Sequence, residues 1–270
     1  MTDASAHHPD LPLALARAAL SSAPAGLLTD LDGTLAPIVA DPHAARPLPQ
    51  AVAALTALAS RLAVVAVVTG RTAAAARRML GTDRLPVFGN HGLERMDAGD
   101  AVARTPERLA WAVPAVARVS ARVPRLPGVW VEDKGLSATF HYRNAADPEA
   151  TCDRLLAEIG DVEGDGLVVR PGRMSLELRP AGAGDKGTAL DELVARHALR
   201  GLVVLGDDVT DLDMFRVAAD ARAAGRYSAA ILAVGGAGEV PAAVGAAADA
   251  MLPDPAAVAR LLSALASGVQ

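Results

Sequence analysis

The sequence predicts an α/β fold with a parallel β-sheet, into which a smaller α+β unit is inserted. Apolar runs of strand length alternate with segments of helical periodicity up to residue 97, and again from residue 184. Between these two regions, short strands come in pairs joined by tight turns, which is typical of antiparallel hairpins. We therefore predict one domain made of residues 1–97 and 184–270, and a second domain made of residues 98–183.

The composition excludes several classes of function. The 270 residues carry a formal net charge of -5 without a basic block, so nucleic acid is not an expected partner. The single cysteine, Cys152, rules out an intrachain disulfide and fits a reducing compartment. No apolar run approaches the roughly 18 residues of a membrane helix, and residues 11–20 are expected to form a surface helix rather than a signal peptide. We expect a cytoplasmic protein without a membrane partner.

The first strand ends in two acidic residues. The apolar stretch 27–29 leads into Asp30 and Asp32, and Gly33 follows. Alternate residues of an extended chain point the same way, so the two carboxylates are expected side by side unless the backbone turns between them. Ligands of open α/β sheets bind at this end of the strands. Paired carboxylates there suit metal binding or catalysis, while a glycine turn with two solvated acids is the alternative.

Two further strands also end in polar residues. Apolar spacing over 50–62 predicts a helix that leads to a β-branched strand at 63–68, which ends at Thr69. A hydroxyl and backbone N–H groups at this strand-to-helix turn suit an anion, although a plain capping turn explains them equally well. A third strand at 86–88 leads into Gly89-Asn90-His91-Gly92-Leu93-Glu94, which is polar where a sheet core would not be.

The inserted region carries polar residues on its expected strands. Residues 107–123 predict one helix, which a proline kinks or splits. Two hairpins, 129–141 and 166–179, flank a helix at 148–159, so we expect a small antiparallel sheet with helices on one face. The polar side chains of the other face suit either a bound sugar phosphate or plain solvation.

The glycine-rich segment 182–187 fits the G-x-G-x-x-G dinucleotide fingerprint, with Asp207 at about the expected distance of 20 residues. Lys186 inside the loop argues against a nicotinamide cofactor, and a cofactor-binding loop would leave the two acids of the first strand unexplained.

Only Lys134 and Lys186 among the 26 basic residues are lysines. A compact ammonium cannot be exchanged freely for a guanidinium, so both lysines are candidates for functional roles. The alternative is that they are ordinary surface residues that remained by chance.

An acidic cluster follows the strand at 202–205. Asp207, Asp208, Asp211 and Asp213 lie so close in sequence that their carboxylates would repel one another strongly without a cation. Oxygen ligands favour a hard ion such as Mg²⁺. A solvated acidic helix start is the alternative, which the preceding buried strand disfavours.

Together these segments resemble the trehalose-6-phosphate phosphatases of the haloacid dehalogenase-like (HAD) superfamily. Asp30-Leu31-Asp32-Gly33-Thr34 is similar to the first HAD motif, and Thr69, Lys186 and Asp207-Asp208 follow in HAD order. The resemblance implies a Rossmann-like HAD core with a C2-type cap at 98–183. The narrower resemblance rests on these segments: Gly89-Asn90-His91-Gly92-Leu93-Glu94, Val131-Glu132-x-Lys134, His141-Tyr142-Arg143, Glu177-x-Arg179-Pro180, Asp185-Lys186-Gly187 and Gly206-Asp207-Asp208-x-Thr210-Asp211.

The resemblance implies Mg²⁺-dependent hydrolysis of trehalose 6-phosphate through an aspartyl phosphate. Asp30 would be the nucleophile and Asp32 the general acid and base, while Thr69 and Lys186 would stabilise the phosphoryl group. The Mg²⁺ ligands would be the Asp30 carboxylate, the Asp32 backbone carbonyl and Asp207. The resemblance also implies substrate-binding roles for Arg71, Asn90, His91, Glu94, Glu132, Lys134, His141, Arg143, Glu177 and Arg179.

Two departures and several alternatives accompany this resemblance. The family often has serine where Thr69 stands, which also supplies a hydroxyl, and usually has glutamate where Leu212 stands, which leaves the helix start there open. Another sugar phosphate, such as a glycosyl-phosphoglycerate or sucrose phosphate, is the alternative substrate. An NAD-binding oxidoreductase and an inactive domain tied to a trehalose-6-phosphate synthase are the alternatives of other classes.

Overall fold

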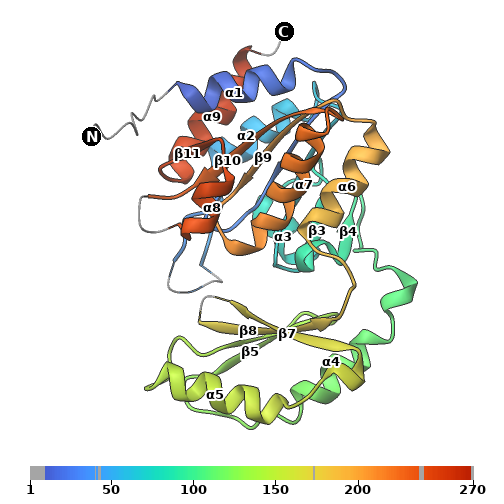
Figure 1. The fold of residues 1–270 in the computed structure, drawn as a ribbon, viewed down its shortest axis with the longest axis vertical. Coiled ribbons are helices and arrows are strands. Elements are labelled where there is room, and N and C mark those ends of the chain that lie inside the picture. Colours follow the sequence, from blue (N-terminus) through green and yellow to red (C-terminus); the bar gives the residue numbers. More distant parts are fainter. Residues whose placement is uncertain (1–9, 40, 42–43, 173, 237–239, 269–270) are drawn as a thin grey trace. The chain divides into compact units, whose positions relative to one another are not determined.

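The computed structural model describes residues 10–39, 41, 44–172, 174–236 and 240–268. The chain divides into two compact units, which we call the larger unit (Met1–Ala103 with Gly184–Gln270) and the smaller unit (Arg104–Ala183). Figure 1 shows that the larger unit is a sheet between helices and that the smaller unit has its own sheet and helices. None of the helices in the described part of the chain has the length and apolar character needed to cross a membrane.

The larger unit is built on a seven-stranded sheet of described residues, in the order β11-β10-β9-β1-β2-β3-β4. The strands run parallel except β4, which pairs antiparallel with β3. The central strands are buried on both faces, as expected for a parallel sheet of continuous apolar runs. The strands are β1 (Ala25–Thr29), β2 (Val64–Val68), β3 (Val87–Gly89), β4 (Glu94–Met96), β9 (Gly201–Gly206), β10 (Ser228–Val234) and β11 (Ala250–Leu252).

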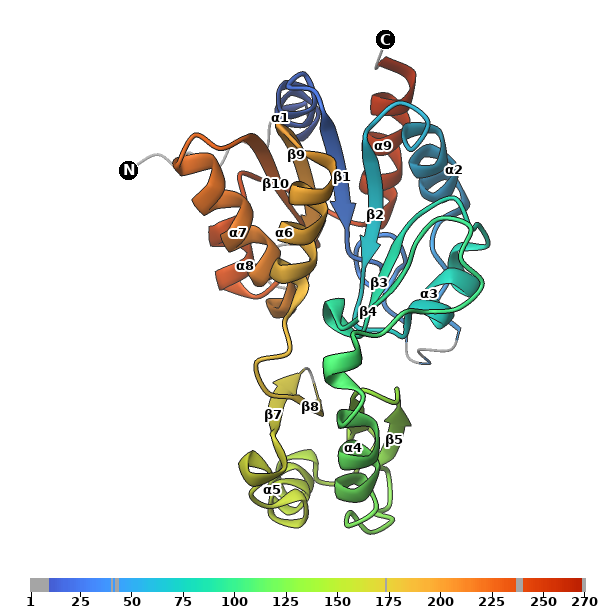
Figure 2. The same ribbon diagram turned by 90° about the vertical axis from the view of Figure 1, so that its right-hand side faces the viewer.

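Helices cover both faces of this sheet, as Figure 2 shows. Leu27 of β1 packs with the helices of one face and Leu28 with those of the other, because neighbouring residues of a strand point to opposite sides. The first group is α1 (Leu11–Leu20), α2 (Pro49–Leu58), α3 (Ala73–Leu80) and α9 (Pro255–Gly268). The second group is α6 (Lys186–His197), α7 (Leu212–Ala223) and α8 (Ala242–Ala247). The predicted α/β class with a parallel sheet is thereby confirmed.

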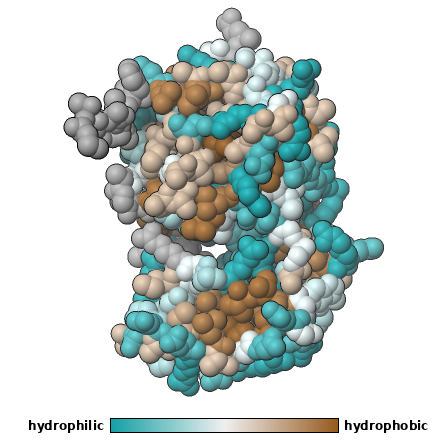
Figure 3. All heavy atoms as spheres, viewed as in Figure 1, coloured by the Kyte–Doolittle hydropathy of each residue, from teal (hydrophilic) through white to brown (hydrophobic). Residues whose placement is uncertain are grey.

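The smaller unit contains a four-stranded antiparallel sheet in the order β5-β6-β8-β7. Its helices α4 (Ala112–Ser120) and α5 (Pro148–Ile159) pack on one face, against Phe140 and Leu178 of the two central strands. The strands are β5 (Trp130–Asp133), β6 (Ala138–His141), β7 (Leu167–Gly172) and β8 (Ser175–Pro180). Apolar residues of β6 and β8 alternate with polar ones, which therefore lie on the face opposite the helices. The viewed side of both units carries mixed polar and apolar surface (Figure 3).

Several details of the helices and strands differ from the predictions, and α8 and β11 were not predicted. The single helix expected at 107–123 is wrong, because a 3-10 turn, η2 (Glu107–Leu109), precedes α4. Pro114 lies in the first turn of α4, where its missing N–H is not needed, so it neither kinks nor splits that helix. Strand β4 was not predicted, because it is short and contains the charged residues Glu94 and Arg95. Only its pairing with β3 identifies it as a strand. Leu212 begins α7 and packs against the core beneath it.

Four charged residues tie β4 and the segment after it to α6. Arg95 contacts both Asp97 and Glu192, and Arg196 contacts the same two carboxylates. The Arg95 Nε–Asp97 Oδ2 and Arg196 Nη1–Asp97 Oδ1 distances are both 3.2 Å. We call these residues the charge ring. Because each side chain is partly exposed, a single pair adds little stability, but a closed network holds its geometry better than an isolated pair.

Candidate active site

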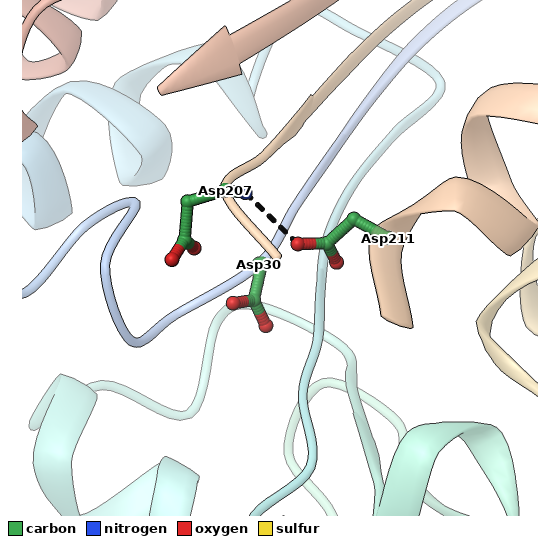
Figure 4. A group of neighbouring side chains, drawn as sticks. All are labelled: Asp30, Asp207 and Asp211. Carbon is green, nitrogen blue, oxygen red and sulfur yellow. Dashed lines mark hydrogen bonds between the residues drawn. The ribbon is translucent and has the colours of Figure 1, made fainter. Parts of the chain in front are cut away.

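The site begins with Asp30, which directly follows β1 at the carboxyl edge of the sheet. The neighbouring strands β9 and β2 run parallel to β1, so Asp207 and Thr69 come to the same edge. The Asp30 backbone N–H donates to the carbonyl oxygen of Leu205, 3.0 Å away. Its side chain is buried, with 5% of the residue exposed, and Figure 4 shows it beside Asp207 and Asp211.

Lys186 joins two of these carboxylates. It is the first residue of α6 and is only 2% exposed. Its Nζ donates to Asp30 Oδ1 at 2.9 Å and to Asp211 Oδ1 at 2.7 Å. The helix starts here because Asp185 and Thr188 form a capping box. The segment 182–187 therefore opens a helix that delivers an ammonium group into an acidic cluster.

Asp211 organises the loop after β9. Its Oδ2 accepts hydrogen bonds from the backbone N–H groups of Asp207, at 2.9 Å, and Asp208, at 3.0 Å. A Cβ at Gly206 would lie 2.4 Å from the Asp211 carboxyl carbon, so the close approach depends on glycine. Asp211 was absent from the predicted site, although it belongs to the acidic run noted in the sequence. Its spacing of four residues from Asp207, across one tight turn, was the available signal.

The three carboxylates can hold a metal ion. One oxygen each of Asp30, Asp207 and Asp211 lies within 4.8 Å of the others. Thr34 Oγ1 donates to Asp207 Oδ1 at 2.9 Å, which orients that carboxylate. Three acids and one lysine leave excess negative charge in a buried place, and oxygen donors fit a hard divalent cation.

Burial raises the pKa values of two of these acids. The pKa of Asp30 rises from 3.8 to about 7, mainly through burial; Lys186 lowers it and Asp211 raises it further. The pKa of Asp207 rises to about 9 through burial and then through the charges of Asp30 and Asp211. Burial alone would lower the pKa of Lys186, but Asp211 and Asp30 outweigh it and the net direction is upward. These acids are thus poorly compensated without a cation.

This arrangement predicts a pH dependence of stability that a metal ion suppresses. The folded, metal-free protein keeps protons on Asp30 and Asp207 that the unfolded chain loses near pH 3.8. Their contribution to stability is complete below that pH and is lost as the pH rises through about 7 and about 9. We expect the melting temperature in EDTA to fall as the pH rises from 6 to 9. With Mg²⁺ it should fall less, because the cation stabilises the ionised forms of Asp30 and Asp207. Parallel pH profiles with and without metal would contradict this assignment.

Gly33 allows Asp207 to approach the first strand, and this gives a second prediction. Gly33 has φ +82°, and a Cβ there would lie 2.0 Å from Asp207 Oδ2. Gly81 also has a positive φ, +65°, but a Cβ there meets no heavy atom of the described residues within 4 Å. Both alanine variants incur backbone strain of about 1–3 kcal/mol, but only Gly33→Ala displaces the carboxylate. We expect Gly81→Ala to keep the Mg²⁺-induced rise in melting temperature and Gly33→Ala to lose most of it. Equal rises would refute the role of Asp207 in metal binding.

Asp32 forms an ion pair with Arg71. The guanidinium is bidentate, with Nε 2.6 Å from Asp32 Oδ2 and Nη2 2.8 Å from Oδ1. The Arg71 backbone N–H also donates to Thr69 Oγ1 at 3.2 Å. Thr69 is buried, whereas the Asp32 side chain keeps 35% of its surface exposed. The first and second predicted motifs are therefore joined by direct contacts.

Three further predicted residues lie beside this turn: Asn90 and His91 between β3 and β4, and Glu94 in β4. The Asn90 backbone N–H donates to the Arg71 carbonyl oxygen at 2.8 Å, and that of His91 donates to the Thr69 carbonyl oxygen at 2.9 Å. Glu94 Oε1 accepts from the Ala73 backbone N–H at 2.6 Å, at the first residue of α3. The backbones of Asn90 and His91 thus hold the Thr69–Arg71 turn, and the Glu94 carboxylate holds the start of α3.

The remaining predicted residues belong to the smaller unit. Glu132 Oε2 lies 3.3 Å from His141 Nε2 and 3.7 Å from Lys134 Nζ, so these three side chains come together. Glu177 and Glu132 both pair in register with one residue of β6, Thr139. Two more predicted residues follow the strands: Arg179 is buried at 4% exposure on β8, and Arg143 is exposed two residues after β6.

Comparisons with known proteins identify relatives of this chain. The sequence matches the trehalose-phosphatase family over residues 28–243. It is 39% identical over 199 residues to a trehalose-phosphate phosphatase of Mycobacterium avium, covering 69% of this chain and 49% of the relative. A probable trehalose-phosphate phosphatase of Sinorhizobium fredii is 33% identical over 193 residues, which cover 70% of this chain and 72% of that protein. The chain spans about half the length of the mycobacterial relatives it matches.

A solved structure has the same fold over nearly the whole chain. The C-terminal domain of a Candida albicans trehalose-6-phosphate phosphatase superimposes with a TM-score of 0.76 at 25% identity, covering 96% of this chain and 97% of that domain. An Aspergillus fumigatus trehalose-6-phosphate phosphatase gives a TM-score of 0.64 at 26% identity, with 94% and 97% coverage.

Proposed function

The chain belongs to the trehalose-phosphatase family, and from that premise we propose that it hydrolyses trehalose 6-phosphate to trehalose and phosphate. The observation that carries the proposal is the buried cluster in which Asp30 shares Lys186 with Asp211 and lies beside Asp207. A carboxylate so placed suits attack on phosphorus, with an aspartyl phosphate as the intermediate.

Electrostatics explains why Asp30 needs this setting. A carboxylate that approaches a dianionic phosphate to about 4 Å meets roughly 8 kcal/mol of repulsion at an effective dielectric constant near 20. Lys186 offsets part of this charge from its contact with Asp30. A bound Mg²⁺, held by the Asp30 and Asp207 carboxylates and the Asp32 backbone carbonyl, would supply the remaining positive charge and polarise the phosphoryl group. Asp211 positions Lys186 and the Asp207 loop.

Asp32 and Arg71 divide the remaining work. Thr69 Oγ1 offers a hydrogen bond to a phosphoryl oxygen, and the Arg71 guanidinium offers a second positive group. Asp32 protonates the sugar leaving oxygen and then activates the water that hydrolyses the aspartyl phosphate. Since both Asp32 oxygens hold Arg71, Arg71 must release at least one oxygen before Asp32 carries that proton. Transfer of the guanidinium to the incoming phosphate provides the release.

We assign the sugar-binding role to the smaller unit. Residues 98–183 act as a C2-type cap in this proposal, with Glu132, Lys134, His141, Arg143, Glu177 and Arg179 as the residues that bind the sugar. Asn90, His91 and Glu94 contribute from the larger unit. A trehalose-6-phosphate synthase would supply the substrate, and the cytoplasm is the proposed location of the reaction.

Phosphate release tests the proposal directly. The assay compares trehalose 6-phosphate with glucose 6-phosphate and sucrose 6-phosphate, with Mg²⁺ or EDTA. We expect release that needs metal and favours trehalose 6-phosphate. Metal-dependent release from another sugar phosphate alone would retain the phosphatase assignment and reject the substrate. No release from any substrate, with metal bound, would reject the activity.

A further inference from the structure

An aromatic pair lies on the polar face of the small antiparallel sheet. Trp130 of β5 and His141 of β6 are direct partners across the two strands. Their rings stack, with centroids 4.4 Å apart and planes inclined by 23°. Glu132, two residues after Trp130 and on the same face, contacts His141 Nε2 at 3.3 Å. The His141 ring therefore supports the indole, and the contact with Glu132 holds the His141 ring in turn.

Trp130 is exposed in a chain that exposes few aromatic rings. Aromatic residues make up 3% of the sequence, and Phe88, Phe140 and Phe215 are fully buried. Trp130 keeps 39% of its surface accessible, and two side chains on its face of the sheet, His141 and Glu132, are polar. A flat apolar surface with a few convergent polar groups is the usual make-up of a small-molecule site.

We propose that Trp130 is the platform on which a pyranose ring of the disaccharide packs, with Glu132 and Lys134 binding the hydroxyl groups at its edge. The inference rests on the proposed function and names a specificity-determining residue for it. A pyranose has an apolar face of C–H groups, which matches an indole face, and hydroxyl groups around its rim, which match a carboxylate and an ammonium. The stack with His141 also holds the plane of the indole.

Trp111 provides a matched control for this experiment. It belongs to the same unit and is 43% exposed, but it immediately precedes α4 and lies beside Gly166, whereas Trp130 lies on β5 and stacks on His141. These two are the only tryptophans of the chain. In the Trp111→Phe variant of this chain, Trp130 is thus the sole tryptophan reporter. Its fluorescence can be titrated with trehalose, which carries no phosphate, so that binding is measured without catalysis.

We expect trehalose to change the Trp130 fluorescence of Trp111→Phe saturably, and to change that of Trp130→Phe, which retains Trp111, much less. In the phosphatase assay, Trp130→Leu should raise KM for trehalose 6-phosphate at least about tenfold, as for truncation of an aromatic anchor. The kcat should change little, and Trp130→Phe should be milder. Circular dichroism checks that each variant is folded.

Two results would overturn the platform. One is an unchanged KM in folded Trp130→Leu together with activity on trehalose 6-phosphate, which would leave the proposed function intact. The other is the absence of a saturable trehalose signal from Trp130. If the wild-type protein releases no phosphate from trehalose 6-phosphate but Trp130 still responds to trehalose, the proposed function fails and the sugar platform stands.

Discussion

Replacing Asp30 with asparagine is expected to abolish phosphate release while leaving the protein folded. Removal of a nucleophile that acts as part of a unit lowers kcat by about 10⁴- to 10⁶-fold in well-studied hydrolases. Asparagine keeps the size of the side chain but removes a buried charge whose ionisation the site disfavours, since burial raises the pKa of Asp30 to about 7. We therefore expect the free energy of unfolding in EDTA near pH 8 to stay equal or to rise.

Two measurements on one protein sample separate these effects. Steady-state phosphate release gives the loss of kcat, and denaturant unfolding gives the stability. A phosphorylated Asp30 trapped from the wild-type protein by rapid acid quench, and absent from Asp30→Asn, would identify the acceptor. Substantial turnover by the folded Asp30→Asn protein would mean that another group attacks phosphorus.

Replacing Lys186 with methionine is expected to impair both stability and activity. Nζ contacts Asp30 at 2.9 Å and Asp211 at 2.7 Å, in a place where all three side chains are almost fully buried. Loss of one partner of a buried ion pair typically costs 3–5 kcal/mol, because an uncompensated charge remains. Methionine fills a similar volume, so the cost reflects charge more than a cavity. Phosphate release should fall by at least about 10³-fold, since Asp30 loses its charge partner and its orientation.

Added Mg²⁺ distinguishes this explanation from simple loss of packing. A cation at the cluster replaces part of the missing positive charge, so the Mg²⁺-induced rise in melting temperature should be larger in Lys186→Met than in the wild-type protein. Arg196→Met, at a partly exposed position of the same helix, should cost well under 2 kcal/mol and leave the Mg²⁺ effect unchanged. An equal Mg²⁺ effect in Lys186→Met and wild type would show that the lysine is not part of the cation site.

The sequence was most informative where strands end. Uninterrupted apolar runs followed by Asp30, Thr69 and Asp207 predicted both the parallel sheet and the group of polar residues at its edge, because parallel strands deliver their carboxyl ends to one place. The rarity of lysine predicted a role for Lys186, and the structure places its ammonium between two carboxylates.

Other features depend on contacts that spacing does not encode. The bidentate pair of Asp32 with Arg71 joins residues 39 positions apart. The role of Asp211 depends on a tight turn that returns its carboxylate to the backbone of Asp207. The β4 strand was missed because its residues are charged, and its pairing with β3 is what organises it. The catalytic and sugar-binding roles of the named residues stay predictions until the variants are measured.

The charge ring affects how the inserted segment could be replaced by that of another protein. It fastens the chain to α6 just before the chain leaves the larger unit, and Asp185 and Thr188 cap α6 just after the chain returns. The two connections to the inserted segment are thus held by contacts among residues of the larger unit alone. A chimera that replaces 104–183 with the equivalent segment of a relative, while keeping Arg95, Asp97 and Asp185, would preserve the anchors around Lys186. Such a chimera could combine the substrate choice of the relative with the phosphoryl chemistry of this chain.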